Sequence, residues 1–455
     1  MIKRLLWILT IGGLVVTAVG QQTAPVQPKT VDPPKLTPLQ LPGLPSKLEI
    51  VANAPLTAAE AVKIALAHQP QVAIAKANAD AAHGQTLQSK AALNPTVGAS
   101  GQYENAHQYS PGTGLVGAQN LMTTQVVLNQ LIFDFNKTRD LVSQSQALER
   151  ASYRTFDQTL QDVALQAKED FYSYVQAKQQ SKVQEANVLS RQAQVDLTQA
   201  QVSAGTGEPS DLVTAKTLLS QSVITLSQAM QAEKTAGVKL ATDMGIDPRT
   251  PIVVAPSIET NVTLPTDLNS LVDLGLKQRP TILSAVESLR AAGYGVSVAR
   301  KTNVPTISAQ VGFDTSGERN PFAAQTGFLA VTLNWTLLDG GLQLGKVRQA
   351  KAEQTVAAQV LKQASQGVIQ DVSNAVVSVQ AARQQIPVAA SEVANAEEGI
   401  RLSQGRYKAG VTTFQEVITA QAALVQAQTD QVTAVAALAI ALSTLDHAIG
   451  KWPVD

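Results

Sequence analysis

Side chains able to do chemistry gather around two short glycine-containing stretches, residues 204–215 and 409–420. The first reads A-G-T-G-E-P-S-D-L-V-T-A and the second reads A-G-V-T-T-F-Q-E-V-I-T-A, without a gap. Each stretch carries an acid two or three residues after the residue that suits a helix start, Asp211 after Pro209 and Glu416 after Thr413. Carboxylates that converge attract cations, but a single acid in the first turn of a helix is also stabilised by the helix dipole. Both interpretations stay open for these two acids.

No residue pattern predicts catalysis, a metal site or a cofactor. The chain has no cysteine and no serine nucleophile motif, and its histidines lack ligand spacing: His68, His83, His107 and His447. Residues 112–117 fit G-x-G-x-x-G, but they lie between two predicted strands and open no helix. We therefore expect this stretch to be a loop, and we expect no enzyme activity.

The two stretches predict tight turns between helices. Gly205 and Gly410 follow helical runs and suit the left-handed position that ends a helix. Pro209 and Thr413, each followed by an acid, suit the start of the next helix. The consequence is a helical hairpin that occurs twice.

The resemblance between the two halves extends beyond the turns. Gln69-Pro70 corresponds to Arg279-Pro280, and N-P-T at 94–96 corresponds to V-P-T at 304–306, both 210 residues apart. The segment 131–134 corresponds to 336–339, and Gly205 corresponds to Gly410, both 205 residues apart. Colinear similarity of this kind predicts two tandem repeats. We place them at 55–245 and 267–450, with a crossover at 246–266 and a tail at 451–455.

Composition favours long helices over several compact cores. The chain has 455 residues, only 4% of them aromatic, and many are alanine or glutamine. Small side chains let long helices pack closely. The net charge of +0 and the lack of a basic block argue against a nucleic-acid partner.

The first 20 residues predict a cleaved signal peptide. Lys3 and Arg4 precede an apolar run that ends in small residues, and the run is shorter than the roughly 20 residues needed to span a bilayer. A membrane anchor is the alternative. Residues 21–54 are rich in proline and predict an extended leader.

Six helices are predicted. Thr57 and Glu60 form a capping box that opens a helix running to about Leu93. Two helices are long, because 137–203 contains neither glycine nor proline and 341–408 is of similar length, with a kink expected at Pro387. Asp134 and Asp339 are their predicted N-caps. The remaining helices are about half as long: 210–244, 267–301 and 414–449.

Alternation with a period of two predicts four strands, two in each half. Loops are expected at about 105–120 and 314–325. Apolar side chains occupy one face, and hydroxyl or amide side chains the other; the apolar set includes Val97, Ala99, Tyr103, Val126, Leu128, Ile307, Val311, Phe313, Leu329, Val331 and Leu333. This pattern is typical of a barrel strand between lipid and a wet lumen, with a half-buried soluble sheet as the alternative. Four strands cannot close a barrel, so several chains must share one.

The order of motifs resembles the TolC-type outer-membrane efflux channel family. The motifs are L-T-x-x-E-A from Leu56, N-P-T from Asn94, L-I-F-D-F from Leu131, W-T-L-L-D-G-G from Trp335 and the two A-G turns. The resemblance covers about 55–450. It implies a mainly α chain with transmembrane β: a homotrimer with a twelve-stranded β-barrel, four strands per chain, continued by a long α-helical coiled-coil tunnel into the periplasm.

The resemblance also implies a function and a site. The function is passive exit of cargo through the outer membrane, delivered by a periplasmic adaptor and an inner-membrane pump. At the pore entrance it places Glu416, where members carry an acid, with Asp211, Thr412 and Thr419. Some members carry an arginine in place of Thr412 and an aspartate in place of Thr419. The implied adaptor-docking residues are Gly205, Gly207, Arg406, Tyr407 and Gly410. The alternative function is a secreted coiled-coil adaptor or scaffold without a pore.

Overall fold

A computed structural model describes residues 55–110, 112, 114–250, 252–254, 267–318 and 322–452. The chain divides into two units, 1–44 and 45–455, and every described residue belongs to the second. The predicted signal peptide and leader lie outside the described residues, as do most of the predicted crossover and the last three residues of the predicted tail.

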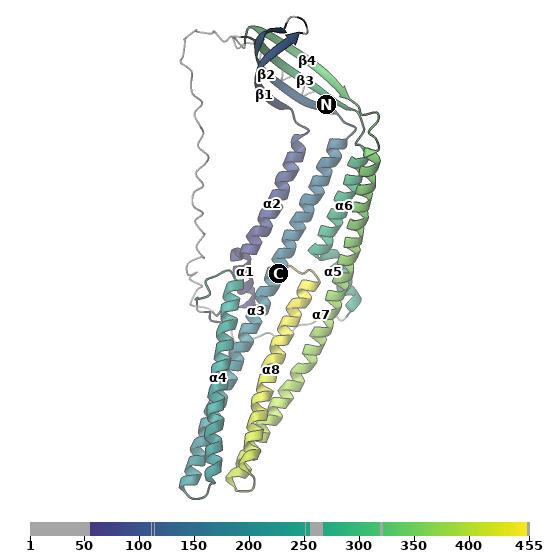
Figure 1. The fold of residues 1–455 in the computed structure, drawn as a ribbon. Helices are drawn as coiled ribbons and strands as arrows, with labels where there is room; N and C mark the ends of the chain where they lie inside the picture. Colours follow the sequence, from purple (N-terminus) through teal and green to yellow (C-terminus); the bar gives the residue numbers. More distant parts are fainter. Residues whose placement is uncertain are drawn as a thin grey trace, which may run out of the picture. The chain divides into compact units, whose positions relative to one another are not determined.

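Within the described residues, two helices, two strands and two helices follow one another, and this order then occurs a second time (Figure 1). The first set is α1 (Ala58–His68), α2 (Pro70–Ala91), β1 (Thr96–Ser110), β2 (Gly114–Phe133), α3 (Lys137–Ser203) and α4 (Pro209–Asp243). The second set is α5 (Leu268–Gln278), α6 (Pro280–Arg300), β3 (Thr306–Gly317), β4 (Ala324–Asn334), α7 (Leu342–Lys408) and α8 (Phe414–Ala448). Figure 1 shows the sheet at one end of α3 and α7 and the two helix–helix turns at the other.

In each half, the first helix was predicted as one continuous helix, and this prediction was wrong. The structure has two helices there. Gln69, between α1 and α2, and Arg279, between α5 and α6, both have extended backbone. A proline disfavours helical geometry in the residue before it, and Pro70 and Pro280 follow these two positions. The predicted capping box is confirmed, since Thr57 and Glu60 each accept from the other's backbone N–H.

The long helices have the predicted lengths but begin differently. Both contain 67 residues, and α7 continues through Pro387. The N-cap positions belong to Asn136 and Gly341 rather than to the predicted aspartates. The aspartates still act at these ends: the Asp134 carboxylate accepts from the Thr138 N–H at 2.7 Å, and Asp339 accepts from the Gln343 N–H at 2.7 Å.

The four strands form one antiparallel sheet in the order β1-β2-β3-β4. Its register pairs Val97 with Leu128, Val126 with Phe313, and Val311 with Leu329, so the predicted apolar side chains share one face. The strands are longer than predicted, because pairing continues to Ser110 and resumes at Gly114. The glycine, serine and asparagine residues at about 105–120 predicted a loop, but most of these positions belong to the paired strands β1 and β2.

Two apolar cores lie at corresponding places along the helices. The first joins α1, α3 and α4 through Val62, Phe171, Tyr174, Leu240 and Met244. The second joins α5, α7 and α8 through Leu271, Val372, Val379, Leu438 and Leu445. The last helix of each core, α4 or α8, is followed by a glycine with left-handed backbone conformation, Gly245 or Gly450. A Cβ atom there would lie 2.6 Å from the His68 carbonyl oxygen or 2.9 Å from the Arg279 nitrogen.

Within the described residues, α8 is long and apolar enough by length and composition to cross a membrane. The same composition fits a packed helix, and 44% of its most apolar window is buried. Its buried residues contact α7 and α3 along its length. We therefore treat α8 as a helix of the bundle.

Candidate functional site

The two turns opposite the sheet have the same backbone geometry. Gly205 and Gly410 have φ of 73° and 71°. The N–H of Thr206 donates to the Gln201 carbonyl at 2.9 Å, and the N–H of Val411 donates to the Arg406 carbonyl at 2.9 Å. These are Schellman motifs, in which a left-handed glycine lets the chain satisfy the last carbonyls of a helix. The predicted positive φ of both glycines is confirmed.

Gly207 is required for a different reason. A Cβ atom at this position would lie 2.8 Å from the Gln201 Cβ and 3.1 Å from that residue's backbone carbonyl carbon. The N–H of Gly207 donates to the Gln201 carbonyl oxygen at 3.1 Å. The first turn therefore folds back tightly on α3, whereas the second turn carries Thr412 at the corresponding position.

Glu416 is held by both sides of the second turn. The Arg406 guanidinium, in the last turn of α7, lies 3.0 Å from Oε1 of Glu416. The Thr412 hydroxyl donates to the other carboxylate oxygen. The ion pair is partly exposed, so it adds little stability, but it fixes where the two charges lie. From the sequence, Arg406 and Glu416 were expected to have separate roles, and their pairing was not predicted.

Tyr407 joins the two hairpins. Its hydroxyl donates to Oδ2 of Asp211, on α4, at 3.3 Å. Its ring lies 5.5 Å from that of Phe414 between centroids. Burial raises the pKa of Tyr407, and the Asp211 carboxylate raises it further. The phenol therefore stays protonated and able to donate at any ordinary pH.

An apolar cluster supports this contact. Its members come from all four helices of the two hairpins and are Val195, Leu212, Ala215, Leu219, Tyr407, Phe414 and Ile418. The hydroxyl of Ser190, on α3, donates to the Gln421 side chain, on α8, at 2.9 Å and adds a second contact between the two hairpins. Phe414 was not among the predicted site residues. The only sequence signal for a role of Phe414 was its aromatic side chain at the start of a helix. The corresponding position after the first turn is Pro209.

Thr419 does not join this network. Its hydroxyl donates at 3.0 Å to the carbonyl of Gln415 in its own helix. The structure thus brings together Asp211 with Tyr407, and Arg406 and Thr412 with Glu416. It leaves Thr419 one turn away on α8.

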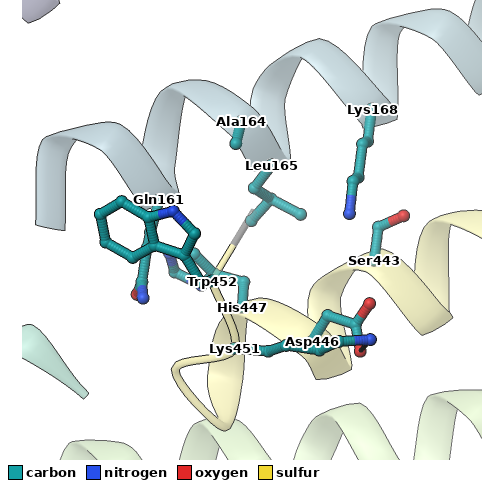
Figure 2. A pocket seen from close by; sticks show the side chains of 9 residues that line it. All are labelled: Gln161, Ala164, Leu165, Lys168, Ser443, Asp446, His447, Lys451 and Trp452. Atoms are coloured by element: carbon teal, nitrogen blue, oxygen red, sulfur yellow. Dashed lines mark ion pairs between the residues drawn. The ribbon is translucent and has the colours of Figure 1, made fainter. Parts of the chain in front are cut away.

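Other hollows in the described chain are open grooves: two of about 530 and 400 Å³ lie along α7 and α8 and are lined largely by alanine and glutamine, and one of about 360 Å³ is lined by Gln69, Lys239 and Asp243 among others. Within the described residues, no group of three or more histidine, aspartate and glutamate side chains could hold a metal ion. A small pocket between α3 and α8 is lined by Gln161, Lys168, Asp446, His447 and Trp452, among others (Figure 2). Its volume of about 20 Å³ suits roughly one water molecule. The two turns are therefore the candidate site.

Over residues 61–245 and 271–451, the sequence matches the family described as outer membrane efflux protein. The chain belongs to this family. Protein CyaE of Bordetella pertussis (strain Tohama I) is 26% identical over 406 residues, covering 87% of this chain and 85% of that protein. Outer membrane protein TolC of Escherichia coli (strain K12) is 23% identical over 376 residues, covering 79% of this chain and 75% of that protein.

The fold is similar to that of solved outer-membrane proteins. The crystal structure of VceC from Vibrio cholerae superposes with a TM-score of 0.75 at 18% identity, covering 86% of this chain and 96% of that one. The efflux protein therefore belongs to a family of outer-membrane channels and not to an enzyme family. The alternative of a secreted adaptor or scaffold without a pore finds no support among these relatives.

Proposed function

We propose that three copies of this efflux protein form one channel of a tripartite export system. Their sheets join into a twelve-stranded barrel in the outer membrane, and their helices continue it as a tunnel into the periplasm. Each copy consists of two tandem repeats. Cargo delivered by an inner-membrane pump and a periplasmic adaptor leaves passively through the tunnel.

The sheet is the observation that carries this proposal. β1 and β4 are its outer strands, each paired on one side only within the described residues. One face is a continuous band of exposed apolar side chains, including Val97, Val311, Leu329, Val331 and Leu333. Open strand edges are not tolerated in lipid, so an apolar sheet of this kind must close with further copies. Three sheets of four strands give an even-numbered antiparallel barrel.

The turns form the periplasmic entrance in this proposal. They lie at the opposite end of the long helices from the sheet (Figure 1). Gly205, Gly207 and Gly410 shape the surface on which the adaptor docks. The Tyr407–Asp211 contact holds the two hairpins of one copy together and keeps the entrance narrow. Glu416 and Arg406 place opposite charges beside the pore.

Membrane fractionation with amine crosslinking tests the channel itself. The protein should fractionate with the outer membrane and crosslink to a species of three copies. A soluble monomer would contradict the proposal.

Conductance in planar bilayers tests the entrance. Tyr407→Phe keeps the ring against Phe414 but removes the hydrogen bond to a carboxylate, worth about 1.5–3 kcal/mol. We expect this variant to conduct more than the wild-type protein. Thr217→Val is the matched control, because Thr217 is not among the predicted entrance residues and its hydroxyl donates to the Val213 carbonyl in its own helix. Equal conductance of Tyr407→Phe and wild type would show that the entrance is held elsewhere.

A further inference from the structure

The two long helices, α3 and α7, occupy corresponding positions in the two halves of the chain, but they do not pack against the same number of helices. α3 packs against α1, α2 and α4, and also against α6 and α8 from the second half. Along most of its length α7 packs only against α5, α6 and α8, its own half, within the described residues. Apart from the contact of Tyr407 with Asp211, no described helix of this chain packs along the side of α7 that corresponds to the α6- and α8-binding side of α3.

The tandem repeats of the proposed function identify the missing partners. α2 corresponds to α6 with positions 210 apart, and α3 and α4 correspond to α7 and α8 with positions 205 apart. If α6 and α8 cover α3, then α2 and α4 should cover α7. Because α2 and α4 of the same chain already cover α3, a second copy must supply them.

The contacts of α3 with α6 and α8 inside the chain, which we call the within-chain seam, include several polar and charged pairs. The hydroxyls of Thr155 and Ser284 lie 3.2 Å apart, and Ser284 donates to the Ala151 carbonyl at 3.1 Å. Nearby, Arg150 pairs with Glu287 at 2.9 Å. At the end near the sheet, Asp140 accepts from Ser297 and pairs with Lys301 at 2.5 Å.

The counterparts of Ser284, Thr155 and Ala151 on α2 and α7 are apolar and exposed. Ser284 corresponds to Ile74, which is 60% exposed, and Thr155 corresponds to Val360, which is 48% exposed. Ala151 corresponds to Val356, which is 63% exposed. The polar group at the sheet end is replaced in the same way, since Asp140, Ser297 and Lys301 correspond to Gly345, Leu87 and Ala91.

Among the contacts of α3 with α8, two positions have exposed apolar counterparts, Val238 and Ile369. Figure 2 shows Lys168, Ser443, Asp446, His447 and Lys451 at this part of the within-chain seam. Their counterparts, in the same order, are Ser373, Val238, Ala241, Thr242 and Ile246. Ala241 and Ile246 are buried in the first core, and Ser373 and Thr242 are polar, so Val238 is the exposed apolar side chain of this set. Ala164, beside the pocket, corresponds to Ile369, which is 43% exposed, and Ser443 corresponds to Val238, which is 48% exposed.

We propose that a second copy of this chain docks on α7 through an apolar surface, the between-copy seam. Ile74 and Val238 of one copy pack against Val356, Val360 and Ile369 of the next. The seam inside a chain includes several polar and charged pairs, and these contacts between chains are apolar. Apolar side chains that are exposed in one chain lose contact with water when the copies join, so this surface supplies a hydrophobic driving force for assembly.

Disulfide crosslinking tests the seam directly, because the wild-type chain has no cysteine. In Ile74→Cys, Val360→Cys, each copy carries both halves of the predicted contact. Mild oxidation of membranes should give covalent dimers and trimers on non-reducing denaturing gels. The Ile369→Cys, Val238→Cys protein should do the same, which keeps the test valid if one variant fails to fold.

Thr155→Cys, Ser284→Cys is the matched control. It occupies the corresponding place inside the chain, so it should form a disulfide without joining copies. Single-cysteine variants should give no trimer. If amine crosslinking yields a trimer while both test pairs stay monomeric, the seam is wrong and the proposed channel stands. If neither method yields a multimer, the proposed trimer fails as well.

Discussion

At the residue scale, the entrance charges come as pairs and not as isolated acids. The carboxylate of Glu416 contacts Arg406 and Thr412 within one hairpin. A trimer would therefore bring three acids and three guanidinium groups to the entrance. Rings of acids favour cations and rings of arginine favour anions, so the selectivity depends on their balance.

Two single substitutions should shift this balance in opposite directions. Glu416→Gln leaves Arg406 unpaired, and the reversal potential in planar bilayers should move toward anion preference. Arg406→Gln leaves the carboxylate unpaired and should increase cation preference and block by a multivalent cation. The double variant should return close to the wild-type value. If Glu416→Gln leaves the reversal potential unchanged, the carboxylate serves only as a helix-start residue.

At the element scale, the turns depend on glycines in left-handed conformation. Gly410→Ala should destabilise the second turn by about 1 kcal/mol, because an alanine at positive φ is strained. Amide hydrogen exchange at residues 409–413 should become faster and crosslinking to the adaptor weaker. Gly399→Ala is the control: this glycine lies inside α7 with nothing within 4 Å of an added Cβ. It should stabilise the helix by about 0.5–1 kcal/mol. Slower exchange in both variants would contradict the proposed strain.

Elements with strong local signals were predicted well. α3 begins at Lys137 and ends at Ser203 as expected, because no proline or glycine interrupts it and a left-handed glycine follows. The breaks before Pro70 and Pro280 were missed although the sequence indicates them, because proline disfavours helical geometry in the residue before it and suits the first turn of the next helix. Both conditions hold here, since one helix ends and another begins at the same residue.

The site was predictable only where its geometry is local. The conformations of Gly205 and Gly410 follow from their places after helical runs. The contact of Tyr407 with Asp211 joins residues far apart in sequence, and it depends on how two hairpins cross. No pattern in the sequence encodes that crossing. The pairing of Arg406 with Glu416 could have been predicted from the sequence, because a five-residue turn between antiparallel helices places these positions side by side.

At the scale of the whole molecule, a pair of aspartates between α3 and α4, one buried and one partly buried, makes the stability of the protein depend on pH. Asp170 on α3 is buried beside Asp243 and Lys239 on α4. A hydrogen bond shared with Asp170, followed by burial, raises the pKa of Asp243 to about 6. Burial also acts to raise the pKa of Asp170, but hydrogen bonds from Asp243, Lys239 and Gln166 outweigh it and hold that pKa below its usual range.

The sign of the pH dependence follows from Asp243. Its pKa is higher in the folded protein than in the unfolded chain, so its contribution to stability is full below about pH 4 and is lost as the pH rises through about 6. Asp170 acts in the opposite sense, but below about pH 4. Between pH 5 and 7, the melting temperature of wild type should fall by on the order of 2 °C relative to Asp243→Asn, whose amide still donates to Asp170. Asp196→Asn, at an exposed position on α3, should track wild type. If the melting temperatures of wild type and Asp243→Asn change with pH in the same way, Asp243 and Asp170 do not share a proton.

The composition of α8 also matters before the protein folds. A protein of the outer membrane first crosses the inner membrane as an extended chain, and a segment that is long and apolar enough can be diverted sideways into that bilayer. Much of the apolar character of α8 comes from alanine, at positions such as Ala434, Ala436, Ala439 and Ala441. A methyl group removes far less area from water than a leucine side chain does, which weakens the drive into lipid. The small side chains that let α8 pack closely against α3 and α7 thus also favour its release during translocation.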